Sequence, residues 1–186
     1  VHDREELQQQ VAFVLDDYRQ PAMVEDFIDG REFHVTVVGN GKLQVLPIAE
    51  MDFSAIMDDR QRLCSYESKF NPDSNDYQTI QLRLPAELST REQRRLEEIS
   101  IAAFRATGCR DYARFDIRLR DGIFYVLDVN PNADISPDTS IALSAEMAGY
   151  SYGQFGSLLV NLAAKRHPLF SRLPRQEGTP RILLNH

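Results

Sequence analysis

The chain has 186 residues, an apolar fraction of 42% and a net charge of −7. That length suits one domain or parts of two, and no apolar run approaches the ~20 residues of a membrane-spanning helix. The negative charge disfavours non-specific nucleic-acid binding, two cysteines define neither a disulfide framework nor a zinc site, and the charged start is not a secretory signal. We therefore expect a cytoplasmic protein with neither nucleic acid nor membrane as a partner.

Hydrophobic periodicity, helix caps and turn residues predict helices that alternate with antiparallel hairpins. The expected elements, in chain order, are a helix from Asp3 to Gln20, a strand over 22–28, a hairpin of 31–38 with 43–49, a short strand over 82–84, a helix from Ser89 to Gly108, a hairpin within 112–130, and helices over 140–148 and 154–166. The first two strands would place Glu25 and Glu32 near a common edge. His34, on the polar side of its strand, is interpreted as a surface or structural histidine.

The hairpin within 112–130 is the most informative stretch of the chain. Its first strand alternates apolar odd positions (Ala113, Phe115, Ile117, Leu119) with charged even positions (Arg114, Asp116, Arg118, Arg120). Its second strand is again largely apolar at odd positions, namely Ile123, Tyr125, Leu127 and Val129. Strict alternation is typical of half-buried strands. We therefore expect both odd sets to face one core.

The turn between these strands decides which side chains meet. A two-residue Asp121-Gly122 turn would pair Arg120 with Ile123 and bring charges against the core. A three-residue loop that also includes Arg120, with Gly122 left-handed, pairs Leu119 with Ile123 instead. We therefore predict the three-residue loop.

With that register, Arg114 faces Asp128, Asp116 lies diagonally beside it, and Asn130 follows on the same side. Two carboxylates and an amide oxygen suit Mg²⁺, which takes one or two protein carboxylates together with substrate phosphates. A guanidinium suits a phosphate or a developing oxyanion. A solvated sheet face with incidental ion pairs is the alternative. We favour a metal site, because an unpaired Asp128 in an apolar run would be costly to bury.

In this order, the segments resemble the ATP-grasp superfamily, and within it the D-alanine–D-alanine ligase-like branch, from the first helix to about residue 165. Residues 24–33 resemble the hinge strand of that family, and residues 66–70 resemble its phosphate-contacting lysine segment. Residues 114–116 and 127–130 resemble its magnesium motifs. The resemblance implies an α+β fold, the carboxy-terminal region of an ATP-grasp protein, with a mostly antiparallel sheet flanked by helices.

The resemblance also implies a role for each part of the site. The adenine of ATP would lie against Glu25, Asp26, Phe27 and Ile28, its ribose hydroxyls against Glu32, and its phosphates against Lys69. One or two Mg²⁺ ions, or Mn²⁺ in their place, would bind Asp116, Asp128 and Asn130, and Arg114 would stabilise the oxyanion. The acceptor substrate would bind Asn132, Asp134, Ser136 and Ser140.

The implied activity is ATP-dependent ligation of a carboxylate to an amine, with formation of a C–N bond. ATP would phosphorylate the carboxylate to an acyl phosphate, which the amine would then attack, and positioning with metal ions would do most of the work. The expected partners are a small-molecule carboxylate and amine, and a homodimer is one assembly that the chain allows. A non-catalytic nucleotide-binding or structural module derived from the same fold is the alternative function.

The chain departs from the family pattern at four places. The family usually has glutamate at the position of Asp128 and lysine at that of Asp26. Asp134 adds a charge to the acceptor loop, which leads to the hypothesis of a cationic or amine-bearing acceptor in place of D-alanine. The glycine-rich phosphate loop, expected before the first helix, is not in the chain. We therefore expect part of a longer enzyme, weakly active alone, with residues 1–50 completing a central subdomain and residues 51–186 forming the carboxy-terminal catalytic domain.

Overall fold

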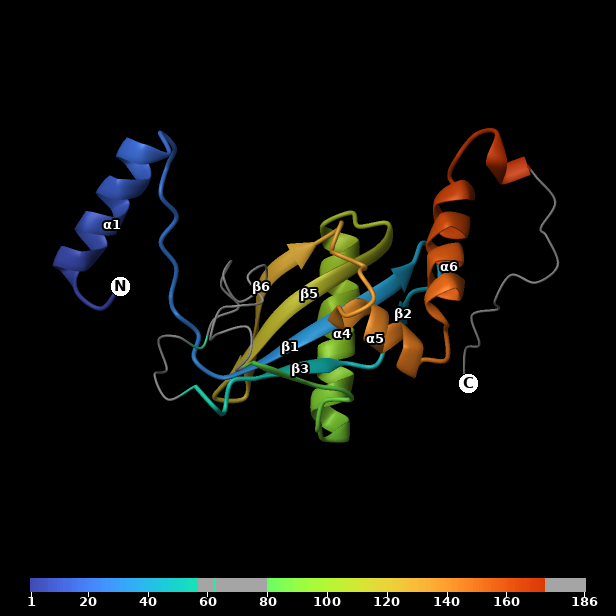
Figure 1. Ribbon diagram of the computed structural model, residues 1–186, viewed down its shortest axis with the longest axis horizontal. Coiled ribbons are helices and arrows are strands. Elements are labelled where there is room, and N and C mark those ends of the chain that lie inside the picture. The colour runs from blue at the N-terminus through green and yellow to red at the C-terminus, as the bar shows by residue number, and fades with distance from the viewer. Residues whose placement is uncertain (57–61, 63–79, 173–186) are drawn as a thin grey trace.

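The computed structural model describes residues 1–56, 62 and 80–172. Its elements are α1 (Arg4–Asp17), β1 (Arg31–Gly39), β2 (Gln44–Val45), β3 (Ala49–Asp52), β4 (Gln81–Arg83), α4 (Thr90–Ala106), β5 (Asp111–Arg120), β6 (Ile123–Asn130), α5 (Ser140–Met147), α6 (Tyr152–Ala164) and a short 3-10 turn, Phe170–Arg172. The strands form one sheet in the order β4-β3-β1-β5-β6, and β2 also pairs with β1 (Figure 1). Every pairing is antiparallel. The predicted α+β fold with a mostly antiparallel sheet is confirmed.

Local capping explains where the helices begin. The Asp3 carboxylate accepts a hydrogen bond of 2.8 Å from the backbone N–H of Glu6 at the start of α1. Ser89 and Glu92 form a complete capping box at the start of α4, which ends just before the left-handed Gly108. Such side chains satisfy amides that have no partner inside the helix. These helix starts follow directly from the sequence.

The amino-terminal segment differs from its prediction in two ways. None of the residues of α1 is buried, and the helix stands away from the sheet (Figure 1), so its apolar face packs against no described element. Residues 22–28, predicted as a strand, form none. A strand needs a hydrogen-bonding neighbour, and both edges of β1 are already occupied, by β3 and β2 on one side and by β5 on the other.

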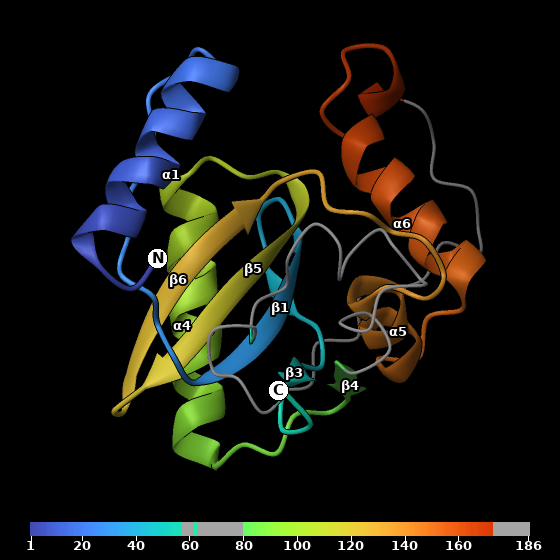
Figure 2. The same ribbon diagram turned by 60° about the vertical axis from the view of Figure 1, so that its left-hand side comes forward.

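Two hydrophobic clusters cover opposite faces of the sheet. On one face Phe33, Val35 and Val37 pack with Leu96 and Phe104 of α4. On the other face Val38 packs with residues of α5 and α6. Figures 1 and 2 show α4 across one side of β1 and β5, with α5 and α6 on the other side near the carboxyl end of β1. The rest of that second face is left to polar side chains.

The β5–β6 turn has two residues, so the predicted three-residue loop is wrong. Asp121 and Gly122 both have positive φ angles, 53° and 77°, and Arg120 pairs with Ile123. Two left-handed residues form the tight turn whose twist matches the strands that it joins. The Asp128 side chain nevertheless stays off the α4 core, because the β5–β6 ladder is interrupted at one position beyond the turn.

That interruption is a β-bulge at Leu127. Asp116 pairs with Asp128 whereas Ile117 pairs with Val126, which leaves Leu127 without a partner. One extra residue reverses the side to which the following side chains point. The α4 face of β6 is therefore supplied by Phe124 and Val129.

The predicted apolar face of β6 is accordingly wrong in part. Ile123 is 55% exposed and Leu127 is 47% exposed, and Tyr125 lies on the polar face opposite Arg118. Only Val129 of the four odd positions packs against the α4 core. The proposed boundary at residue 50 stays a prediction, and the sheet itself continues across it, since β1 pairs with β5.

Candidate active site

The polar face of the sheet is built by alternate residues of β1 and β5. Glu32 pairs with Arg118, and His34 pairs with Asp116. Because cross-strand partners point to the same side, these four side chains gather on the face opposite α4, where His34 meets the start of α5. All four are buried. Such a cluster of buried ionisable groups is typical of a functional site.

The β5–β6 ladder adds the predicted metal ligands to this face. Asp116 stands directly opposite Asp128, and Arg114 stands opposite Asn130. The predicted pairing of Arg114 with Asp128 is wrong, because it assumed the longer turn. The bulge at Leu127 still leaves all four side chains on one face, as the sequence pattern predicted.

Arg114 and Asp116 form a bidentate ion pair. The Arg114 Nε lies 2.7 Å from Asp116 Oδ1, and Nη2 lies 2.9 Å from Oδ2. A carboxylate offers about four lone-pair positions, so each Asp116 oxygen can accept a further partner. Asp128, expected to be buried in an apolar run, is instead exposed, so the cost of burying it does not support a metal site. The Asn130 Oδ1 accepts only a local hydrogen bond of 3.2 Å from the backbone of Asn132 among the described residues.

This donor set fits a magnesium ion that is shared with phosphates. Asp116, Asp128 and Asn130 offer hard oxygen atoms from one side, and Mg²⁺ normally completes its octahedron with water and substrate phosphate. Within the part of the chain that the structure describes, no group of three or more His, Cys, Asp or Glu residues could hold a metal. The residues present therefore suit an open, substrate-dependent site and not a closed protein cage.

His34 is a residue of this site that the sequence did not reveal. It is 6% exposed, not a surface residue, and its Nδ1 lies 3.0 Å from the hydroxyl of Ser140 at the start of α5. Its Nε2 lies 3.7 Å from Glu32 Oε1 and 3.8 Å from Asp116 Oδ1, and it has no hydrogen-bond partner among the described residues. His34 thus contacts the predicted substrate residue Ser140 and lies near the predicted nucleotide ligand Glu32 and the predicted metal ligand Asp116.

Glu32 is held as a buried carboxylate. Burial by itself opposes its ionisation, but His34 and the positive charge of Arg118 outweigh burial and lower the Glu32 pKa to about 2. The Arg118 Nε donates to Glu32 Oε2 over 2.8 Å, the closest of these contacts. Glu32 is therefore a permanent acceptor at neutral pH.

The predicted hinge residues precede β1, and their carboxyl end lies beside the same cluster. Glu25, Asp26 and Phe27 are exposed, whereas Ile28 is buried. The Ile28 carbonyl accepts a hydrogen bond of 2.6 Å from Arg118, and the Phe27 carbonyl accepts one of 3.2 Å from Arg120. Backbone contacts thus bring the end of the hinge to the sheet. Lys69 lies outside the described residues.

The predicted acceptor loop follows β6 and ends at α5. Asp134 accepts bonds of 2.8 Å from the Ser136 amide and 2.7 Å from its hydroxyl. These two bonds lower the Asp134 pKa. Asn132 is exposed and Ser140 is buried against His34. The loop residues therefore lie at different depths, with Ser140 the one in contact with the polar face.

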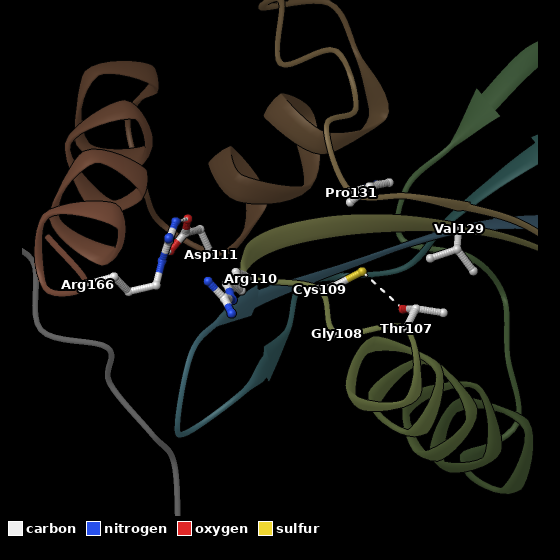
Figure 3. A pocket seen from close by; sticks show the side chains of 8 residues that line it. All are labelled: Thr107, Gly108, Cys109, Arg110, Asp111, Val129, Pro131 and Arg166. Atoms are coloured by element: carbon white, nitrogen blue, oxygen red, sulfur yellow. Dashed lines mark hydrogen bonds and ion pairs between the residues drawn. The ribbon is translucent and has the colours of Figure 1, made fainter.

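A separate hollow lies on the other side of β6 and is not part of this site. Its lining is Thr107, Gly108, Cys109, Arg110, Asp111, Val129, Pro131 and Arg166 (Figure 3). Figure 3 shows Arg166 reaching Asp111, with which it forms an ion pair, and Cys109 beside Thr107. Val129 alternates with Asp128 and Asn130 along β6, so its side chain points away from the predicted ligands.

Most of the chain matches one known protein family. The family described as D-ala D-ala ligase C-terminus matches residues 1–162. The chain belongs to this family. Its fold is accordingly that of a ligase-like ATP-grasp carboxy-terminal domain, which confirms the resemblance seen in the hinge and magnesium motifs.

The relatives in this family span more sequence than this chain does. It is 36% identical over 168 residues to the uncharacterized protein y4sG of Sinorhizobium fredii, covering 90% of this chain and 48% of that protein. It is 32% identical over 170 residues to D-alanine–D-alanine ligase A of Mesorhizobium japonicum, covering 90% of this chain and 45% of that enzyme. The chain thus spans about half the length of the curated relatives that it matches.

Solved structures of the family share the fold. The D-alanine–D-alanine ligase of Bacillus anthracis, complexed with ATP, superposes with a TM-score of 0.69 at 22% identity, over 89% of this chain and 48% of that one. The VanG D-Ala:D-Ser ligase of Enterococcus faecalis gives a TM-score of 0.64 at 19% identity, over 86% and 43% of the two chains.

Among the described residues, no helix is long and apolar enough to span a membrane.

Proposed function

We propose that this chain supplies the metal- and nucleotide-binding half of an ATP- and Mg²⁺-dependent ligase that joins a carboxylate to an amine. The observation that carries the proposal is the direct pairing of Asp116 with Asp128, with Arg114 held on the same face by Asp116. Like charges directly opposite in a sheet are destabilising. Arg114 offsets this repulsion in part by its pair with Asp116, and a cation between the two carboxylates would offset the rest.

Each group on this face has a use in that reaction. Asp116, Asp128 and Asn130 would hold Mg²⁺, which when bound neutralises phosphate oxygens. Arg114 would stabilise the negative oxygen that develops when the amine attacks the activated carbonyl. The ionised Glu32 would accept hydrogen bonds from the ribose hydroxyls, and Phe27 and Ile28 would flank the adenine.

The reaction balances without a protein nucleophile. The γ-phosphoryl group of ATP passes to the substrate carboxylate and gives ADP and an acyl phosphate. The amine then attacks the carbonyl carbon, the C–N bond forms, and inorganic phosphate leaves as the amine loses a proton. Phosphoryl transfer of this kind depends chiefly on positioning and charge stabilisation. Weak activity of the chain alone, and Lys69 as a phosphate contact, remain parts of this proposal.

The acceptor substrate is proposed to bind along Asn132, Asp134, Ser136 and Ser140. The relatives named as D-alanine–D-alanine ligases suggest D-alanine as a first candidate. Asp134 instead favours a cationic or amine-bearing acceptor, although its Oδ1 is already engaged by Ser136. Measured ligation of D-alanine alone, with no gain from a cationic acceptor, would overturn this second idea.

The test of the proposed function is Asp116→Asn in the full-length protein that contains this chain. We expect loss of ADP release, because a neutral amide cannot hold both Arg114 and the metal, while circular dichroism shows a folded protein. Asp121→Asn is the matched control, since Asp121 is an exposed carboxylate in the β5–β6 turn, outside the predicted site, and asparagine tolerates its left-handed backbone. Unchanged biological activity in the Asp116 variant would favour the alternative, a non-catalytic nucleotide-binding or structural module.

A further inference from the structure

Arg118 is the largest fully buried side chain among the described residues, and the proposed function gives it no role so far. It is 1% exposed and lies in β5 on the same face as Asp116. An arginine seldom has such burial without paired contacts. The sequence alternation placed it on the polar face but gave no sign that solvent is excluded there.

The guanidinium of Arg118 joins three separate segments. Its Nε donates to Glu32 Oε2 in β1 over 2.8 Å, and its Nη1 donates to the Ile28 carbonyl over 2.6 Å. Its Nη2 donates to the carbonyl of Arg62. Phe27 and Phe53 complete the enclosure, with their ring centres 5.3 Å and 5.4 Å from the guanidinium carbon.

A buried ion pair of this kind needs a reason other than stability. Well-packed apolar side chains are often as stabilising as a buried ion pair, because desolvation offsets the attraction of the charges. What an apolar side chain cannot do is fix a carboxylate in one orientation and anchor a backbone carbonyl in the same step. Arg118 does both, for Glu32 and for Ile28.

The orientation leaves the second oxygen of the buried Glu32 without a hydrogen bond among the described residues. Arg118 engages Oε2, while Oε1 faces His34 at 3.7 Å, beyond hydrogen-bond distance. Each carboxylate oxygen also retains lone pairs beyond those in use. Glu32 is therefore held as a preoriented acceptor beside the end of the hinge.

We propose that Arg118 is a positioning residue for nucleotide binding, which aligns Glu32 with the ribose hydroxyls and fixes Ile28 against the sheet, and so gives the protein its preference for ribonucleotides. This inference rests on the proposed function. It concerns a substrate-specificity determinant that touches no reacting atom.

The experiment compares ATP, 2′-deoxy-ATP and 3′-deoxy-ATP as substrates of the full-length protein and of its Arg118→Met variant. We expect the wild-type protein to prefer ATP. In the variant the KM for ATP should rise by about tenfold or more, as for loss of a hydrogen bond to a charged group, while kcat changes little and the preference for ATP over the deoxynucleotides narrows.

Arg31→Met is the matched control. Arg31 also forms a two-point ion pair with a buried glutamate, Glu50 of β3, at 2.7 Å. Arg31 lies in β1 next to Glu32 but points to the opposite face of the sheet, toward α4. Its loss should lower stability without changing the nucleotide preference. A similar narrowing in the Arg31 variant would show that any damage to β1 suffices, and would overturn the proposal.

A second substitution covers the case in which Arg118→Met does not fold. Arg118→Lys retains the charge beside Glu32 but cannot reach both the Ile28 and Arg62 carbonyls, so a reduced preference is expected from it as well. An unchanged preference in a folded Arg118 variant overturns the inference alone. If the wild-type protein neither binds nor uses ATP, the proposed function fails and the inference fails with it.

Discussion

Asp116 and Asp128 are direct cross-strand partners because Leu127, between Val126 and Asp128, has no partner in the β5 ladder. Without that bulge, the two-residue turn would place Leu127 opposite Asp116 and turn Asp128 toward α4. The bulge thus reconciles a tight turn with a carboxylate pair on the polar face. Bulges often serve to redirect a side chain at a functional site.

The first prediction tests the two-residue turn through Ile123 and Phe124, which lie between the turn and the bulge. Phe124 packs against the α4 core, with its ring centre 6.4 Å from that of Phe33, whereas Ile123 is 55% exposed. Phe124→Ala should therefore lower the free energy of unfolding by about 2–3 kcal/mol, and Ile123→Ala by less than about 0.5 kcal/mol. Urea denaturation measures both. A larger loss of unfolding free energy in Ile123→Ala than in Phe124→Ala would favour the three-residue loop instead.

The second prediction concerns the repulsion between Asp116 and Asp128. In the presence of EDTA, Asp128→Asn should raise the free energy of unfolding by about 0.2–1 kcal/mol, because one of two opposed charges is removed. Excess magnesium chloride should raise the melting temperature of the wild-type protein by mass action and have less effect on the variant. Asp121→Asn, at an exposed turn position where asparagine tolerates the left-handed backbone, should change neither value. A destabilised Asp128 variant in EDTA would contradict the prediction.

The third prediction concerns Glu32 and pH. The Glu32 pKa lies at about 2 in the folded protein and at 4.5 ordinarily, so the carboxylate stabilises the fold fully above pH 4.5. This contribution, about 3 kcal/mol, should be lost as pH falls from 4.5 toward 2. Glu32→Gln lacks it and also leaves Arg118 buried without its counter-charge.

The measurement for this third prediction is the difference in unfolding free energy between wild type and Glu32→Gln across pH. Other carboxylates with lowered pKa values, including Asp111, also weaken the fold in acid, but they are common to both proteins and cancel in the difference. The difference should be large at pH 7 and shrink below pH 4.5. A difference that does not depend on pH would show that Glu32 is not held ionised.

The fourth prediction concerns Gly30, which precedes β1. Its φ angle is +151°, and a Cβ at this position would lie 2.0 Å from the carbonyl oxygen of Leu119. Gly30→Ala should therefore cost about 1–3 kcal/mol in stability. A Cβ on Gly41, in the β1–β2 connection, would meet no heavy atom within 4 Å, so Gly41→Ala is the control and should be near neutral. Equal thermal midpoints for the two variants would disprove this close approach.

Local signals in the sequence determined most of the secondary structure. Asp3, the Ser89–Glu92 capping box and Gly108 mark helix ends by hydrogen bonds and backbone angles within a few residues. Alternation over residues 112–120 marks a half-buried strand for the same local reason. These features depend on neighbours in the chain, so a single sequence can reveal them.

The sequence also determined the composition of the candidate site, although not its arrangement. It placed Arg114, Asp116, Asp128 and Asn130 on one face, and the ladder agrees. The Leu127 bulge was missed, because the alternation of apolar and polar residues in β6 is the same whether the turn has two residues with a bulge or three without one. The chemical roles of these residues remain predictions.

The tertiary structure alone decided which polar residues are buried together. His34 and Arg118 belong to strands far apart in the chain, and only the β1–β5 pairing brings them beside Asp116 and Glu32. Burial is set by elements that cover a residue from elsewhere in the sequence, so no local pattern encodes it. The sequence therefore specified the charges of this site, and long-range packing specified which of them are removed from water and which are left to meet a ligand.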